Sequence, residues 1–435
     1  MFTKFISGWG NYKTIKSTIY QPRNIDELKK IIKQNKKFTI RSKGRSYGDS
    51  SLGKNIISLD MLKEFIELDE KKGVIHCSAN LTIENILNQT LSKGWFLRVT
   101  PGSKFISVGG LIASDVHGKN HHKDGTFCNH LLEIEILLNN GKVLRINKKK
   151  SANFFKSTCG GMGLTGVVLS AKFKMLKIKS SYIIQDTIKT NSLKETINCL
   201  DKFNHKKYVV GWIDTANHNT LGRSVIYTGE HYNKGGFNLK KKNVYNLKKF
   251  LQFFSIFSSN FILKIMSTFY FSIHKNRKKQ IVHSNNFFYP LDTIKGWNFF
   301  YGNRGFIQFQ VLIKKKNAIK NIYKIIDYLI KNNQISFLST IKKLGIKNDN
   351  YLSFPDNGYT LTMDIKNNKK MKNIFNKLEK FLIKIDSKVY LTKDSIMSKK
   401  FFYKSYKDLG KFKKVLNKFN KNNKFISLQS ERLKI

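Results

Sequence analysis

The sequence predicts a protein of the α+β class with two domains. Its 435 residues exceed what one ordinary hydrophobic core organises, and a hydrophobic fraction of 40% is that of a packed globular chain. Up to about residue 178, short strands and helices alternate around glycine-rich loops. Beyond that point these loops stop, and strands alternate with longer helical stretches. We therefore expect a domain boundary near Ser180.

The elements of the first half follow from capping residues and apolar periodicity. A helix is expected over Ile25–Gln34 with Asn24 as its N-cap, and another over Leu81–Ser92 with Thr82 as its N-cap. The strands expected in this half are Lys37–Arg41, Val74–Ser78 and Leu164–Met175, and an Asn-Gly turn joins Glu133–Leu138 to Lys142–Ile146 in a hairpin.

The second half combines ordinary elements with one apolar segment, Phe250–Ile273. The segment is long enough to span a bilayer, and basic residues flank it on both sides. Lys264 lies in its middle, at a cost of about 2.5–3.5 kcal/mol, so a helix lying in the membrane interface fits better than a spanning one. A buried helix or lid of the second domain is an equal alternative. The other elements expected here are strands over Val209–Ile213 and Phe306–Ile313 and helices over Ala318–Lys331 and Lys370–Ile385.

Charge and cysteine content restrict the class of protein and its compartment. The formal net charge of +52 favours anionic partners, namely nucleic acid, anionic lipid head groups or phosphorylated substrates. Zinc fingers, aromatic RNP motifs and basic zippers do not occur in the sequence, so a basic surface facing water is the simpler interpretation. Four widely spaced cysteines indicate free thiols in a reducing compartment, and the N-terminus is too interrupted for a signal peptide. We expect a cytoplasmic protein, with peripheral binding to the inner face of the cytoplasmic membrane as the alternative.

Three glycine-rich segments in the first half are candidate ligand loops: Arg41–Asp49, Thr100–His122 and Cys159–Gly166. Glycine lets backbone amides approach a ligand closely, and successive amides form concavities suited to a pyrophosphate. Any one segment alone is more simply a turn. Three of them between short strands predict a cradle for a dinucleotide.

Two familiar site patterns are rejected. Gly161–Gly166 matches G-x-G-x-x-G, but the β-branched residues from Val167 predict a strand where the dinucleotide fingerprint requires a helix. A metal site is not expected, because the candidate ligands lack the spacing of a compact zinc site: His117, His121, His122, Cys128 and His130.

The three segments also carry a family resemblance. SYGDSSLG, TPGSKFISVGGLIASDVHGKNHHKDGTF and CGGMGLTGVVLSA resemble the FAD-binding domain of the p-cresol methylhydroxylase and vanillyl-alcohol oxidase superfamily. SDVHGKNHH is closely similar to the motif of the decaprenylphosphoryl-ribose oxidase family within it. The similarity is weakest at about Gly235–Asn285. Elsewhere it continues in order through FYPLDTIKGWN, GFIQFQ, SFLSTIKKLG, LSFPDNGYTLTMD and YLTKDS.

The resemblance implies a two-domain flavoprotein. Residues 1–178 would form an FAD-binding domain of two α/β subdomains, and residues 179–387 a substrate-binding domain built on an antiparallel sheet with helices. Residues 388–435 would return to the FAD-binding domain. Arg45 occupies the place where some relatives attach the flavin to a histidine, so non-covalent FAD is expected. The residues implied to bind FAD are Ile40, Arg41, Ser42, Lys43, Gly44, Arg45, Ser46, Tyr47, Gly48, Asp49, Ser50, Gly102, Ser107, Val108, Gly109, Gly110, Ser114, Asp115, Val116, His117, Val167 and Tyr390.

The resemblance also implies a substrate cavity beside the flavin. Lys393 would act as a point charge and His117 as the base for a sugar hydroxyl; the competing interpretations are a surface lysine and a structural histidine. Two positions depart from the mycobacterial members. This sequence has Thr362 where they have a cysteine, and Phe288 where they have a tyrosine. Gln308 and Gln310 alternate along a strand and therefore face the same side. The implied substrate-binding residues are Gln308, Gln310, Lys342, Thr362 and Lys393, and the implied catalytic residues are His117, Lys393 and Tyr47.

The function implied is FAD-dependent oxidation of a secondary sugar hydroxyl. The 2′-hydroxyl of polyprenylphosphoryl-β-D-ribose would become the 2′-keto intermediate in epimerisation to the arabinose lipid of cell-wall arabinan. An NAD(P)H-dependent short-chain reductase would complete the epimerisation, with quinone or oxygen as electron acceptor, an anionic membrane surface as a further partner and no role for nucleic acid. The alternatives are an FAD-dependent sugar or aldonolactone oxidase acting on a soluble substrate and, in another class, a non-catalytic basic binding protein.

Overall fold

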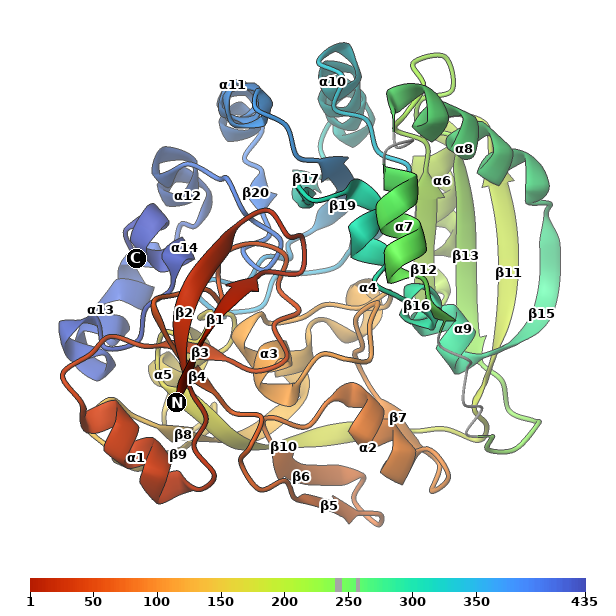
Figure 1. Ribbon diagram of the computed structural model, residues 1–435. Helices are drawn as coiled ribbons and strands as arrows, with labels where there is room; N and C mark the ends of the chain where they lie inside the picture. Colours follow the sequence, from red (N-terminus) through yellow and green to blue (C-terminus); the bar gives the residue numbers. More distant parts are fainter. Residues whose placement is uncertain (239–244, 256–258) are drawn as a thin grey trace.

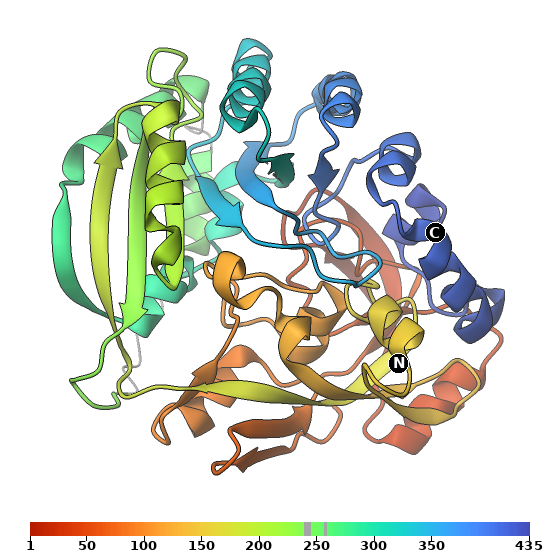
Figure 2. The ribbon, with the colours of Figure 1, turned by 180° about the vertical axis from the view of Figure 1, so that it is seen from behind.

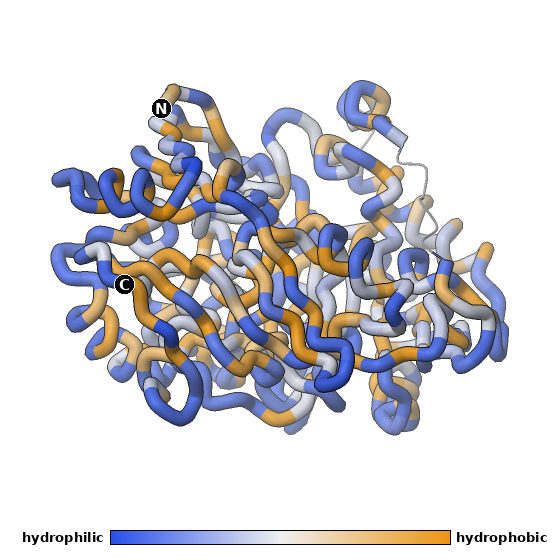
Figure 3. Tube along the Cα trace, turned by 90° about the horizontal axis from the view of Figure 1, so that it is seen from below, coloured by the Kyte–Doolittle hydropathy of each residue, from blue (hydrophilic) through white to orange (hydrophobic). Residues whose placement is uncertain are grey.

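The computed structural model of the protein describes residues 1–238, 245–255 and 259–435. These residues form two sheets in the N-terminal region and, beyond it, one large sheet and a two-stranded sheet (Figure 1). Figure 3 shows hydrophilic residues along much of the outer part of the chain trace, with apolar stretches between them. The mixture of helices and sheets confirms the α+β class predicted from the sequence.

The first sheet is small and begins with a hairpin that the sequence did not predict. Its order is β1-β2-β4-β3, in which β2, β4 and β3 run parallel. Helix α1 (Ile25–Lys33) is capped by the side chain of Asn24, as predicted, and buries Leu28 and Ile32 against this sheet. The strands are β1 (Phe2–Ser7), β2 (Thr14–Tyr20), β3 (Thr39–Arg41) and β4 (Asn55–Ser58).

The second sheet has the order β5-β6-β10-β8-β9, and a sixth strand, β7, pairs with β10. Its strands are β5 (Ile66–Asp69), β6 (Val74–Ser78), β7 (Trp95–Leu97), β8 (Leu131–Leu137), β9 (Val143–Ile146) and β10 (Val167–Lys177). Gly141 takes a φ of +83° between β8 and β9, which confirms the predicted Asn-Gly turn. The helices are α2 (Ile83–Thr90), α3 (Val108–Ala113), α4 (His121–Asp124), η1 (Phe127–His130) and α5 (Ala152–Thr158). Thr82 caps α2 as predicted, and the helix is shorter than the predicted Leu81–Ser92 at both ends.

The third sheet is antiparallel throughout and has the order β15-β11-β13-β12-β18-β19-β17-β20. Helices α6 (Leu193–Lys202), α10 (Ala318–Lys331) and α11 (Met371–Lys384) cover one face, as Figure 2 shows. The strands are β11 (Tyr182–Thr190), β12 (Tyr208–Ile213), β13 (Ser224–His231), β15 (Arg277–His283), β17 (Phe306–Lys314), β18 (Ser339–Leu344), β19 (Gly358–Lys366) and β20 (Lys388–Val389). The predicted strands and helices of the second half are therefore confirmed to within a few residues.

The predicted apolar segment forms two helices, α7 (Lys248–Phe254) and α8 (Asn260–Ile273), and residues 256–258 between them lie outside the described part. A single continuous helix over Phe250–Ile273 is therefore wrong. One face of α8 packs on the large sheet, with Leu263 and Ser267 buried and Tyr270 in ring contact with Trp212 at 4.7 Å. The opposite face is exposed, so the buried-helix interpretation holds for one side of α8, and binding of the segment to a membrane interface stays a prediction. No helix in the described ranges has the length and apolarity needed to cross a membrane.

The C-terminal segment packs on the first sheet, where the blue helices of Figure 1 adjoin the red N-terminal strands. Phe38 N donates to Lys424 O at 2.8 Å, and Ile426 N donates to Phe38 O at 2.9 Å. The Arg432 guanidinium binds the buried carboxylates of Asp49 and Asp394 at 2.8 and 2.7 Å. The remaining elements are η2 (Phe203–His205), β14 (Tyr245–Asn246), α9 (Ser284–Phe288), η4 (Pro290–Thr293), β16 (Ile294–Lys295), η5 (Trp297–Tyr301), α12 (Lys399–Ser405), α13 (Leu409–Phe419), η6 (Lys421–Asn423) and α14 (Leu428–Leu433).

Candidate active site

The first glycine-rich loop is held between the N-terminal hairpin and the C-terminal segment. Trp9 N donates to Ser46 O at 2.8 Å, and Tyr47 N donates to Thr392 O at 3.1 Å. A Cβ on Gly48 would lie 1.8 Å from the carbonyl oxygen of Asp394, so only glycine fits this approach. Two segments far apart in the sequence thus fix the shape of the loop.

Five of the predicted FAD residues of this loop fall into two groups. Arg41, Lys43 and Asp49 are committed to other protein groups: Arg41 donates to Ser7 O, Lys43 pairs with Asp60, and Asp49 binds Arg432. Ser42 Oγ and Arg45 Nε are buried without a hydrogen-bond partner in the described part of the chain. The first group shapes the loop, and the second leaves polar atoms for a ligand.

The second glycine-rich segment forms α3 and the turn after it. Ser107 caps α3 by accepting a hydrogen bond from Gly110 N, and nothing lies within 4 Å of a Cβ built on Gly102. Asp115 is fully buried with a φ of +40°, and its carboxylate accepts hydrogen bonds from side chains of the loop between β18 and β19. Those donors are Asn348, Asn350 and Ser353, at 2.7, 2.9 and 2.6 Å. Asp115 therefore joins this segment to the large sheet.

The third glycine-rich segment leads directly into β10, which confirms that Gly161–Gly166 is not a dinucleotide fingerprint. The side chain of Val167 is fully buried in the apolar core with Leu137 and Ile57. Unlike the loop residues, it does not join the polar groups described below.

One face of the large sheet carries the predicted substrate residues. Gln308 pairs in register with Asp364, Gln310 with Thr362, and Lys342 with Thr360. Cross-strand partners project to the same side, so these six side chains form one polar surface. The alternate residues of β17 and β19, such as Phe309 and Leu361, pack beneath the helices on the other face.

His117, from the second segment, meets this polar surface. Gln310 Nε2 lies 3.0 Å from His117 Nε2 and also donates to Thr360 Oγ1. Because an amide nitrogen only donates, His117 Nε2 is the acceptor and its proton lies on Nδ1, which is buried and has no partner among the described residues. Tyr390 adjoins the ring at 5.2 Å between centroids and donates to Ser114 O.

Lys393 and Tyr47 complete the cluster. The Lys393 ammonium lies 3.8 Å from the centroid of the Tyr47 ring, a cation–π contact. Gln308 Nε2 donates to the buried carboxylate of Asp364. Four residues of this cluster are only half-buried, so part of each side chain stays accessible to a ligand: Tyr47, Gln308, Lys342 and Lys393.

The electrostatics of the cluster are dominated by burial. Burial, followed by the charges of Lys342, His121 and Lys393, holds the pKa of His117 well below its usual value, so the imidazole is neutral. Burial lowers the pKa of Lys342 to about 8. Burial also lowers the pKa of Lys393 and raises that of Asp364, and each charge partly offsets the shift of the other.

Two residues of the cluster were missed in the sequence. Asp364 follows Thr362 at the alternation expected for the same strand face, so the period-two pattern contained the signal. Lys119 follows His117 in SDVHGKNHH and donates to the backbone oxygens of Phe287 and Phe288 at 2.8 and 3.1 Å. Burial, with the nearby Lys342, lowers the pKa of Lys119 to about 7.

The other histidines of the second segment are engaged with the backbone. His121 Nδ1 accepts from Gly345 N at 2.9 Å, and His122 Nε2 and His130 Nε2 lie 2.8 Å from the carbonyl oxygens of Lys206 and Asp124. These contacts give each ring a structural role.

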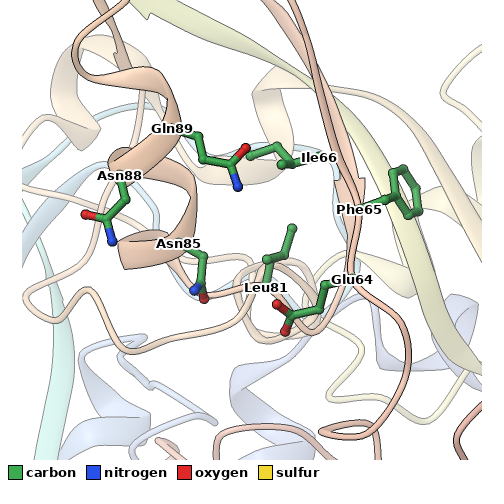
Figure 4. A pocket seen from close by; sticks show the side chains of 7 residues that line it. All are labelled: Glu64, Phe65, Ile66, Leu81, Asn85, Asn88 and Gln89. Atoms are coloured by element: carbon green, nitrogen blue, oxygen red, sulfur yellow. The ribbon is translucent and has the colours of Figure 1, made fainter.

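A separate cavity of about 250 Å³ lies between α2 and β5 (Figure 4). No predicted site residue lines it, and Asn85 on its wall already forms the capping box of α2. Its lining residues are Glu64, Phe65, Ile66, Leu81, Asn85, Asn88 and Gln89.

The cluster fits an FAD lying between the glycine-rich loops and the polar face of the large sheet. Ser42 Oγ, Arg45 Nε and His117 Nδ1, which have no hydrogen-bond partner among the described residues, offer polar contacts, and Gly102 leaves open space. The guanidinium of Arg45 stacks on Trp9 at 4.3 Å and supplies positive charge for a pyrophosphate.

Comparisons with known proteins agree with this fit. Residues 17–147 match a family model described as FAD binding domain. The whole chain is 25% identical to decaprenylphosphoryl-β-D-ribose oxidase of Mycolicibacterium smegmatis, over 98% of that protein. D-lactate dehydrogenase of Archaeoglobus fulgidus is 22% identical over 42% of this chain and 43% of its own length. D-arabinono-1,4-lactone oxidase of Candida glabrata is 21% identical over 43% of this chain and 37% of its own length.

The chain is an FAD-dependent oxidoreductase with an α+β architecture. Within this class it is an FAD-binding oxidase that resembles decaprenylphosphoryl-β-D-ribose oxidase along its entire length. FAD as the cofactor, predicted from the sequence motifs, is thereby confirmed.

We expect acid precipitation of the purified protein to release all of its FAD. Arg45 stacks on Trp9, and the resemblance implies that it stands where some relatives carry a linking histidine. The measurement is flavin absorbance of the supernatant and of the washed pellet. A yellow pellet, with a flavin-modified peptide in its mass spectrum, would contradict non-covalent binding.

Proposed function

We propose that the protein oxidises the 2′-hydroxyl of a polyprenylphosphoryl-β-D-ribose to the 2′-keto product. Residues 1–178 with 388–435 would bind FAD, and residues 179–387 would bind the substrate. The full-length similarity to an oxidase of that substrate supports the proposal. The composition of the cluster around His117 supports it independently.

The observation that carries the proposal is the excess of lysine over carboxylate around His117. The charges of Lys342 and Lys393 act on His117, Lys342 also acts on Lys119, and Asp364 is the carboxylate that acts on Lys393. The lowered pKa values of the three lysines mean that burial disfavours their charges, and repulsion from Lys342 adds to this effect at Lys119 and Lys393. A bound phosphate would offset both effects, which favours a phosphorylated substrate.

The polar side chains of the sheet support a sugar substrate. Gln308 and Gln310 project from the same face, and because their amide nitrogens already donate to protein groups, we assign their amide oxygens to accept from sugar hydroxyls. When bound, FAD supplies the hydride acceptor. The chain must then hold the C–H bond in place and accept the hydroxyl proton.

Asp364 is the better supported proton acceptor. His117 Nε2 already accepts a hydrogen bond from Gln310, so the neutral ring presents Nδ1–H as a donor. Asp364 has a raised pKa, as expected of a general base that works near neutrality. In this proposal His117 orients Gln310, while Lys393 and Tyr47 stabilise the alkoxide that forms as the proton leaves.

The proposed reaction requires partners. The 2′-keto product needs a reductase to become the arabinose epimer, and we propose an NAD(P)H-dependent short-chain enzyme. The electrons removed from the sugar pass on to quinone or oxygen. Because the substrate carries a polyprenyl chain, we place the reaction at the inner surface of the cytoplasmic membrane.

A second candidate function is oxidation of a soluble aldonolactone. The partial similarity to D-arabinono-1,4-lactone oxidase favours it. The two candidates differ in whether the substrate carries a phosphate.

The test is turnover of purified protein with farnesylphosphoryl-β-D-ribose and with D-arabinono-1,4-lactone, followed by reduction of an electron-accepting dye. We expect turnover of the ribosyl lipid, a 2′-keto product by mass spectrometry, and little activity on the lactone. A Lys342→Gln variant should have a raised KM for the ribosyl lipid. Turnover of the lactone alone would overturn the proposal.

A further inference from the structure

Helix α8 has apolar residues on both of its sides. Leu263 and Ser267 are buried on the side that packs against the large sheet. On the opposite side, Phe261, Ile265 and Phe269 follow one another at intervals of four residues and are 71%, 51% and 64% exposed. A surface helix normally presents polar residues there. The three side chains therefore form an exposed apolar stripe, a feature typical of an interaction site.

Helix α7 extends the apolar surface toward the candidate active site. Phe250 and Phe253 are 55% and 63% exposed on it. The Lys248 ammonium at its start lies 4.4 Å from the Phe299 ring of η5. Trp297, the first residue of η5, contacts Phe306 of β17 at 5.7 Å between ring centroids.

A further ring contact connects this apolar surface to the candidate active site. Phe306 contacts the Tyr47 ring at 5.6 Å. Helix α8 covers the same face of the sheet, because Tyr270 packs on Trp212, which pairs in register with Thr340. Thr340 in turn pairs with Thr362 of the polar surface. The apolar stripe and the candidate active site thus lie on one side of the large sheet.

The same region is strongly basic. Between Glu230 and Asp292 the sequence has eleven lysines and arginines and no aspartate or glutamate. Seven of them are exposed in the described part and form no ion pair there: Lys248, Lys249, Lys264, Lys275, Arg277, Lys278 and Lys279. The last three begin β15, the edge strand of the sheet. An apolar stripe with a basic border matches the surface of an anionic bilayer.

We propose that α7, α8 and the start of β15 form a docking face for an anionic lipid bilayer. The aromatic side chains would enter the acyl boundary, and the lysines and arginine would contact the head groups. A second copy of the chain fits poorly, because each copy carries a net charge of +52 and the face itself is basic. The purpose of the face rests on the proposed function, since docking would bring a lipid-linked substrate to the side of the sheet that bears the site.

The test is co-sedimentation of the FAD-loaded protein with vesicles of phosphatidylcholine, with and without phosphatidylglycerol. We expect binding to the anionic vesicles that falls with added salt. The triple variant Phe261→Ser, Ile265→Ser, Phe269→Ser should bind about 100-fold more weakly, since it loses three buried apolar groups. The variant Arg277→Gln, Lys278→Gln, Lys279→Gln should lose a similar factor on anionic vesicles alone.

The matched control is Phe5→Ser, which removes an aromatic side chain that is 68% exposed on β1. It should bind vesicles like the wild type. All variants should keep their FAD and their turnover of a short-chain substrate, which shows that they are folded. Wild-type vesicle binding by both triple variants, or a loss of self-association without any vesicle binding, would overturn the proposal. Vesicle binding needs no substrate, so a failure of the docking proposal can be distinguished from a failure of the proposed function in the ribosyl-lipid assay.

Discussion

Replacing Lys393 by alanine is expected to slow oxidation of the substrate by about 100-fold or more. The ammonium lies on the Tyr47 ring and beside Asp364 inside the cluster, at a fixed place. Negative charge develops on the sugar oxygen as its proton leaves, and a preorganised cation stabilises that charge more than the neutral hydroxyl. The measurement is anaerobic stopped-flow, in which substrate is mixed with the loaded protein and the flavin absorbance is followed.

Two further variants define the role of Lys393. Lys393→Arg should restore little activity, because a planar guanidinium does not match a site shaped for a point charge. Lys63→Ala, which removes an exposed lysine, should change nothing. All three proteins should contain normal amounts of FAD. An undiminished rate in fully loaded Lys393→Ala protein would show that the lysine has no part in the reaction.

Replacing Asp364 by asparagine is expected to lower kcat/KM by roughly 100- to 1,000-fold, the usual contribution of a general base. Burial raises the pKa of this carboxyl to about 7. A base works only when deprotonated, so wild-type kcat/KM should rise as the pH increases through this value and then level off. A carboxamide at this position cannot titrate, and the residual activity of the variant should lose that rise. The measurement is kcat/KM between pH 5 and about 9.

The asparagine preserves the shape of the residue and its acceptor oxygen for Gln308. A fall in rate without loss of FAD would therefore reflect the missing base. Asp26→Asn, at a carboxylate whose side chain is 83% exposed, is the matched control and should keep the wild-type pH profile. If Asp364→Asn retained the rise with pH, another group would be the proton acceptor, and His117 would be the first to test.

Local patterns predicted much of the fold. The cap at Asn24, the Asn-Gly turn at Gly141 and the helix over Ala318–Lys331 depend on neighbours in the sequence, and all three are confirmed. The β1–β2 hairpin was missed. The pairing of β20 with β17 brings together Val389 and Val311, far apart in the chain, and no local pattern records such a contact.

The candidate site was predictable to the same extent. Alternation placed Gln308 and Gln310 on one face, and the register of β17 agrees. The importance of Asp364 was missed because it depends on Gln308, 56 residues earlier, and on Lys393 in another segment. The apolar segment was ambiguous for a different reason. Both sides of α8 are apolar, so periodicity alone did not show which side would pack on the sheet.

The tie between Asp49 and Arg432 bears on when the enzyme acquires its cofactor. The two residues are separated by 383 positions, and the glycine-rich loop that carries Asp49 also needs Thr392 as a hydrogen-bond acceptor. During synthesis the N-terminal sheets emerge first, with this loop lacking both partners. The loop can take its final shape only after residue 432 has left the ribosome. Loading with FAD is then a late event, and a ribosome stalled before that point would hold a nascent chain that binds the flavin weakly.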